Sequence, residues 1–80
     1  MDTAQISLNQ LPIGRKAHVF ALTFDGTIRR RMLDLGIVDG TEIEPLYKSP
    51  SGNPAAYLIR GAVIALRSDV SEKIIVSINK

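Results

Sequence analysis

The stretch GTIRRRMLDLGIVDG, residues Gly26–Gly40, decides the fold that we expect for this chain of 80 residues. It is the only part of the sequence with a clear helical pattern. Its Ile28, Met32 and Leu35 are spaced four and then three residues apart, so they fall on one helical stripe. We therefore predict a short α-helix over about residues 27–35 that turns this stripe toward the core.

The residues around this helix predict where it begins and ends. Thr27 is the expected N-cap, since its hydroxyl can accept a hydrogen bond from an unpaired amide of the first turn. Gly36 follows the last apolar residue, where a residue in the left-handed conformation commonly ends a helix. Asp39-Gly40 then predicts a tight turn into the next strand.

The other face of the helix carries charge. Arg29, Arg30, Arg31 and Asp34 are expected to point away from the apolar stripe, with Leu33 among them. An apolar side chain inside a basic, solvent-facing arc indicates a contact surface. Two interpretations stay open. Either the three arginines and Leu33 bind a partner, or Leu33 tucks against the rim of the domain and the arginines are merely solvated.

Composition narrows the class of protein. Hydrophobic residues make up 45% of the chain and charged residues 22%, as in ordinary globular domains. The net charge of +2 is too small to indicate a nucleic-acid binder, and the lack of cysteine excludes disulfides, thiolate metal sites and cysteine catalysis. No apolar run approaches the roughly 20 residues of a membrane span, and the N-terminus lacks signal-peptide features. We expect a single cytoplasmic domain over residues 1–80.

The rest of the chain is typical of short strands and turns. Ile6–Gly14 is expected to be turn-rich with one helical turn, and Gly61-Ala62 to be a tight turn. Arg67–Lys73 is expected to form a short helical turn capped by Ser68 or Asp69. The expected strands are Arg15–Thr23, Thr41–Tyr47, Ala55–Arg60, Val63–Leu66 and Ile74–Ile78. About five strands, with one helix between the first two, predict a mainly β fold, a small and partly open barrel.

Two of these strands carry further expectations. Both faces of Arg15–Thr23 are largely apolar, so this strand is expected to be covered on both sides. Pro45 lacks an amide hydrogen, so it marks either a sheet edge or a bulge within Thr41–Tyr47.

Four pieces of the sequence together resemble the FeoA family of small accessory proteins of bacterial ferrous iron transport. The central piece runs from Arg29 to Ile43, RRRMLDLGIVDGTEI. The others are the opening Leu8, Leu11 and Gly14, the loop SPSGNP at Ser49–Pro54, and the hairpin YLIRGAVIALR at Tyr57–Arg67. Their order and spacing cover nearly the whole chain, from about Ile6 to Ile78.

The resemblance implies a barrel of the Src-homology-3 (SH3) type, in agreement with the strand count. It also implies a partner, since FeoA-type proteins are held to act on FeoB, the membrane iron permease with a cytoplasmic GTP-binding domain. The same fold occurs as the C-terminal domain of iron- and manganese-dependent repressors. This chain has no DNA-binding helix-turn-helix, so a complete repressor is excluded.

Candidate metal ligands are few. Divalent iron favours clustered histidine and carboxylate ligands, yet His18 is the single histidine and lies in the middle of an expected strand. Glu42 and Glu44 share one strand face and could hold a cation such as Fe²⁺ weakly. We predict no tightly bound metal or cofactor. We also predict no catalytic residues, because no nucleophile-base set or phosphate-binding loop is present.

These observations lead to one principal hypothesis and two others. The principal hypothesis is a non-enzymatic module that binds the cytoplasmic part of a FeoB-type permease and modulates it, touching the membrane only through that partner. The second is a stand-alone regulator that binds a transition metal or RNA, although the few aromatic residues argue against nucleic acid. The third is a GTPase-activating factor that inserts one of Arg29, Arg30 or Arg31 into the nucleotide site. A homo-oligomer stays open, because the edges of a small barrel can pair between chains.

Overall fold

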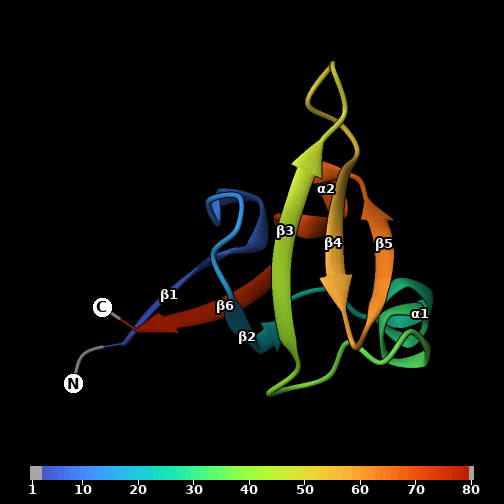
Figure 1. The fold of residues 1–80 in the computed structure, drawn as a ribbon. Coiled ribbons are helices and arrows are strands. Elements are labelled where there is room, and N and C mark those ends of the chain that lie inside the picture. The colour runs from blue at the N-terminus through green and yellow to red at the C-terminus, as the bar shows by residue number, and fades with distance from the viewer. Residues whose placement is uncertain (1–2, 80) are drawn as a thin grey trace.

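Six antiparallel strands form one sheet in the order β1-β6-β2-β3-β4-β5 (Figure 1). The computed structural model describes residues 3–79, so residues 1, 2 and 80 of the expected domain lie outside the described range. Along the chain the elements are β1 (Thr3–Ser7), the 3-10 turn η1 (Leu8–Gln10), β2 (Ala17–Leu22), α1 (Gly26–Asp34), β3 (Glu42–Lys48), β4 (Ala55–Ile59), β5 (Ala62–Leu66), α2 (Ser68–Ser71) and β6 (Ile74–Asn79). The predicted mainly β class with one short helix is confirmed.

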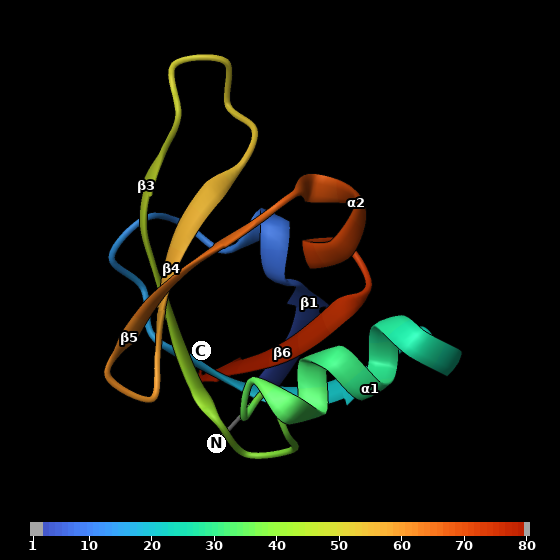
Figure 2. The same cartoon turned by 90° about the vertical axis from the view of Figure 1, so that its right-hand side faces the viewer.

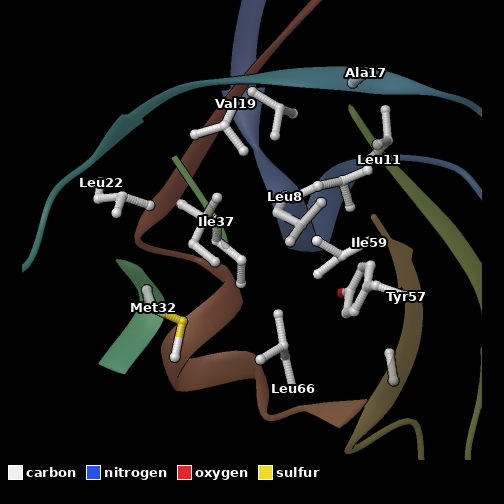
Figure 3. Close-up of a cluster of buried hydrophobic side chains, with 14 residues drawn as sticks. Leu8, Leu11, Ala17, Val19, Leu22, Met32, Ile37, Tyr57, Ile59 and Leu66 are labelled. Carbon is white, nitrogen blue, oxygen red and sulfur yellow. The ribbon is translucent and has the colours of Figure 1, made fainter. Parts of the chain in front are cut away.

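The sheet curls around a single apolar core. Figure 2 shows β3, β4 and β5 on one side of the molecule, with β6 and α1 on the other. Side chains from η1, β2, β3, β4 and β6 meet between them, as the close-up in Figure 3 shows. The largest fully buried side chains are those of Leu8, Ile37, Ile43, Ile59, Ile74, Val76, Pro45 and Ser71.

The expected count of about five strands becomes six, because β1 was not predicted. Its sequence, TAQIS, has one large apolar residue, Ile6, so the period-two pattern of a half-buried strand is weak. The strand exists because it pairs along its whole length with β6, from Thr3↔Asn79 to Ser7↔Ile75. The helical turn expected in this part of the chain is present as η1.

The two bulges of the sheet decide which side chains reach the core. In β2, Phe20 lies at a register shift between Val19 and Ala21 and is 54% exposed. The expectation that both faces of this strand are covered is therefore wrong. In β3 the register with β4 shifts between Pro45 and Tyr47, which confirms the bulge. The pairing with β2 does not extend past Ile43, so Pro45 also lies where one side of β3 has no strand beside it.

Helix α1 ends as expected but begins one residue early. Its N-cap is Asp25, without a side-chain capping bond, so Thr27 lies inside the first turn and is not the cap. At the C-terminus, the Gly36 amide donates to the Leu33 carbonyl at 3.0 Å and the Ile37 amide to the Met32 carbonyl at 2.9 Å. This pair of bonds is a Schellman motif, and Gly36 has the required φ of +87°.

Two other local expectations also shift. The turn between β4 and β5 is formed by Arg60 and Gly61, both with positive φ, in place of Gly61-Ala62. Helix α2 has Arg67 as its N-cap, so neither Ser68 nor Asp69 caps it. The Ser68 amide donates instead to the Asn53 side-chain oxygen at 3.0 Å. A side chain of the β3–β4 loop therefore accepts the hydrogen bond of the first amide of this helix.

Candidate interaction surface

Helix α1 is the least buried element of the fold. Met32 alone among its residues belongs to the core, while Ile28 is 48% exposed and Leu35, just past its end, is 41% exposed. The predicted stripe therefore reaches the core only at its centre. The physical reason is that α1 lies outside the sheet, across the molecule from β3, β4 and β5 (Figure 2), so only the middle of its apolar stripe reaches the core (Figure 1). The fully buried Ile37, in the loop after the helix, fills the core in their place.

The three arginines of α1 are exposed, and they differ in their contacts. The Arg29 guanidinium donates to the Leu22 carbonyl at 3.2 Å and so ties the helix to the end of β2. Within residues 3–79, the guanidinium groups of Arg30 and Arg31 make no hydrogen bond or ion pair. Arg29 thus has a structural contact, whereas the other two guanidinium groups face solvent.

On the surface of the helix, Leu33 lies between Arg29 and Arg30. It is 39% exposed and lies one residue after the buried Met32. Leu33 is therefore partly covered and partly open to solvent, and both interpretations of this residue stay open. With Ile28 and Leu35, Leu33 gives α1 and its end three large apolar side chains that the fold leaves partly uncovered.

An apolar groove of about 540 Å³ runs between α1 and β5. Helix α1 contributes three of the wall residues, Leu35 just past its end a fourth, and β5 three more. Arg67 and Val70 lie at the α2 end of the groove. The residues that line it are Ile28, Arg31, Met32, Leu35, Ile64, Ala65, Leu66, Arg67 and Val70. Sequence reasoning did not find this groove, because its two walls are about thirty residues apart in the chain and only the fold brings them together.

The candidate metal ligands do not converge. Glu42 and Glu44 line a separate polar hollow, of about 390 Å³, together with Lys16 and Arg60. Two cationic side chains beside two carboxylates would compete with a bound cation for the same oxygens. His18 lines a different hollow, and no group of three or more His, Cys, Asp or Glu residues within 3–79 could hold a metal ion.

One buried polar pair supports the framework. Burial raises the pKa of Tyr57, and a side-chain hydrogen bond with Ser71 lowers it by less, so the net direction is upward from 10.0. Tyr57 lies in β4 and Ser71 in α2, and both are almost fully buried. The pair therefore joins α2 to the sheet next to the groove.

Comparison with known protein families matches residues 6–78 to the FeoA domain. The chain belongs to the FeoA family. This family is linked to ferrous iron transport, and the match covers the four sequence pieces on which the resemblance was based.

Solved structures of FeoA proteins have the same fold. A FeoA-like protein from Clostridium acetobutylicum is 38% identical, with 90% of this chain and 84% of that chain covered and a TM-score of 0.82. A zinc-complexed FeoA from Stenotrophomonas maltophilia is 28% identical over 89% of this chain and 88% of that one, with a TM-score of 0.79. It is described as a prokaryotic SH3 domain protein and a candidate activating factor of bacterial ferrous iron transport. The predicted SH3-like barrel is thereby confirmed.

More distant similarity concerns the fold alone. The protein IdeR of T. acidophilum is 18% identical, with 95% of this chain but 35% of that chain covered and a TM-score of 0.81. Comparison with curated protein sequences gave no match. Within the described residues of this FeoA-family chain, no helix is long and apolar enough to cross a membrane.

Proposed function

We propose that this FeoA-family chain is a non-enzymatic accessory protein of ferrous iron transport, which binds the cytoplasmic part of a FeoB-type permease and modulates it. The family supplies the link to iron transport. The observation that carries the proposal is the solvent-facing side of α1, where Leu33 is exposed next to arginines that have no acidic neighbour in an ion pair. Such a surface suits an acidic protein partner, with charge speeding encounter and fixing orientation.

The contact in this proposal is formed by Arg29, Arg30, Arg31 and Leu33. Leu33 supplies the apolar centre, and Arg30 and Arg31 supply charges that are free to pair with carboxylates of the partner. Arg29 remains bonded to the Leu22 carbonyl and keeps the helix in place. The chain would work in the cytoplasm and meet the membrane only through the permease.

Calorimetry with the purified cytoplasmic domain of the permease tests this function. We would measure binding of the chain to this domain in the presence of GDP and of a GTP analogue, each with and without ferrous iron. Leu33→Asp should weaken binding at least tenfold, whereas Val38→Asp should not. Val38 is a matched control because it is 40% exposed, compared with 39% for Leu33, and follows α1 outside the contact. Equal affinities for the two variants would place the contact elsewhere, and no binding by the unmodified chain would reject the partner.

A GTPase-activating role is a second candidate, and the different contacts of the arginines favour a specific form of it. Because Arg29 is bonded within the fold, the inserted residue would be Arg30 or Arg31. A finger that stabilises the transition state is worth a large factor in GTP turnover. Replacement of the inserted arginine by Lys or by Ala should then abolish any stimulation of GTP turnover without abolishing binding. If the unmodified chain leaves GTP turnover of the permease unchanged, this role is rejected.

A tight iron site is not part of the proposed function. Glu42 and Glu44 lie with Lys16 and Arg60 in the polar hollow, so we expect a divalent cation such as Fe²⁺ to bind weakly there at most. Anaerobic titration of the isolated protein with ferrous iron should give no stoichiometric binding below micromolar concentrations. Stoichiometric sub-micromolar binding would contradict this expectation.

A further inference from the structure

Strand β5 is an edge of the sheet. It pairs with β4 alone, from Ile59↔Ala62 to Ala55↔Leu66. Alternate residues of such a strand direct their amide and carbonyl groups away from the paired neighbour. Among the backbone hydrogen bonds given for residues 3–79 outside helices and strands, none involves Val63, Ile64 or Ala65. The outer side of β5 therefore has backbone groups available to a further strand.

This edge lacks the features that usually protect one. Its sequence, AVIAL, contains no charged residue, no proline and no glycine, and Val63 is 58% exposed. Soluble proteins normally place a charge, a proline or a covering element on such an edge, because it otherwise pairs with other chains. Helix α1 does not cover this edge, because the groove separates the helix from β5.

The groove has room for a short extended segment, since its volume is about 540 Å³. The five residues of β5 set the length over which such a segment can pair. Residues of α1 and β5 line the groove with apolar side chains, including Ile28 and Leu35 from the helical side and Ile64 from the strand. A segment paired with β5 would direct every second side chain into these apolar walls.

The charge of the groove lining indicates which kind of segment can bind. Arg31 and Arg67 line the groove, and no acidic residue does. Asp69 approaches the Arg67 guanidinium at 3.8 Å, but both side chains are largely exposed, so this ion pair is weak and Arg67 can exchange partners. A bound segment therefore gains from carboxylates next to the two arginines, and a basic segment would be repelled.

We propose that the groove between α1 and β5 binds an extended segment of the partner protein, which adds to β5 as a further antiparallel or parallel strand. Apolar side chains at alternate positions of the segment contact the groove, and acidic residues at its ends pair with Arg31 and Arg67. Strand addition at an open edge gives affinity through the backbone, and the groove gives specificity through the side chains. This inference rests on the proposed function, since the segment is assigned to the same partner.

The test uses the full chain, labelled with ¹⁵N, and two probes: the cytoplasmic domain of the permease, and 12-residue peptides that cover its other cytoplasmic segments. We expect amide hydrogen exchange in β5 to slow at least tenfold when the binding probe is present. Ala65→Glu, which puts a carboxylate into the groove, should weaken binding at least tenfold. Ala62→Glu is the matched control, because it makes the same exchange on the same strand outside the groove lining, and its affinity should stay within twofold.

The outcomes separate the two proposals. Binding of a probe with no change at β5, or with equal affinities for the two glutamate variants, overturns the strand addition and leaves the proposed function standing. No binding of any probe rejects the proposed function and the segment with it. A third outcome is slow amide exchange in β5 without a probe, together with a concentration-dependent dimer in ultracentrifugation. This result would assign the edge to a second copy of this chain and also overturn the inference.

Discussion

The side chain of Arg60 lies over the backbone of Gly36. A Cβ atom built on Gly36 would be 2.6 Å from the Arg60 Cδ atom, and Gly36 itself has φ of +87°. Two pieces of the FeoA sequence pattern, the end of the helix and the β4–β5 turn, therefore meet at this point. Gly36 is needed for both its conformation and its lack of a side chain.

We predict that Gly36→Ala lowers the free energy of unfolding by about 1–2 kcal/mol, chiefly from the cost of positive φ. The contact with Arg60 adds less, because the far part of that side chain can move. Urea unfolding of Gly36→Ala, Arg60→Ala and the double variant separates the two costs. A double variant that regains most of the lost stability would show that the contact, and not φ, is the main cost.

Substitution of two adjacent residues of α1 should change the stability of the fold very differently. Met32 is 4% exposed and Leu33 is 39% exposed. Met32→Ala should cost about 2–5 kcal/mol, as large-to-small changes in a core do, whereas Leu33→Asp should stay within about 0.5 kcal/mol. Thermal and urea unfolding check both values. A large loss of stability in Leu33→Asp would place this side chain in the core and remove it from the contact surface.

The loop between β3 and β4 should stabilise α2 through one side chain. The Asn53 side-chain oxygen accepts from the Ser68 amide at 3.0 Å. Asn53→Ala leaves this amide unpaired and should cost about 1 kcal/mol, as the loss of other N-terminal caps does. Asn53→Asp, which keeps the acceptor, serves as the control in the same unfolding measurements. Equal losses in both variants would mean that the hydrogen bond contributes little.

Stability should fall in alkaline solution because of Tyr57. Burial raises its pKa above 10.0 in the folded chain, so above the unfolded pKa the folded state binds more protons than the unfolded state. The stabilisation is fully present below about pH 10, the unfolded value, and is lost as pH rises through the folded pKa.

Phenolate absorbance measures this shift directly. The chain has two tyrosines, so Tyr47→Phe leaves Tyr57 as the single signal. The midpoint should lie above pH 10.0, and Ser71→Ala should raise it further, because the hydrogen bond with Ser71 lowers the pKa. A midpoint at or below 10.0 would contradict the burial argument.

Local signals in the sequence predicted the parts of the fold that depend on local chemistry. Gly36 ends α1 because positive φ suits glycine, and Pro45 marks a bulge because it has no amide hydrogen. Two of the errors arose where a distant residue provided the partner. The start of α2 depends on Asn53, which is fifteen residues earlier, and β1 depends on β6 at the other end of the chain.

The sequence by itself determined the fold class, the family and the position of the basic helix, since these depend on residue order and periodicity. The tertiary structure alone decided what the helix does with its apolar residues. Periodicity places Ile28, Met32 and Leu35 on one stripe, but it cannot say how much of that stripe a barrel covers. Only Met32 reaches the core, because α1 lies outside the sheet, and the partly exposed Ile28 and Leu35 line the groove between α1 and β5.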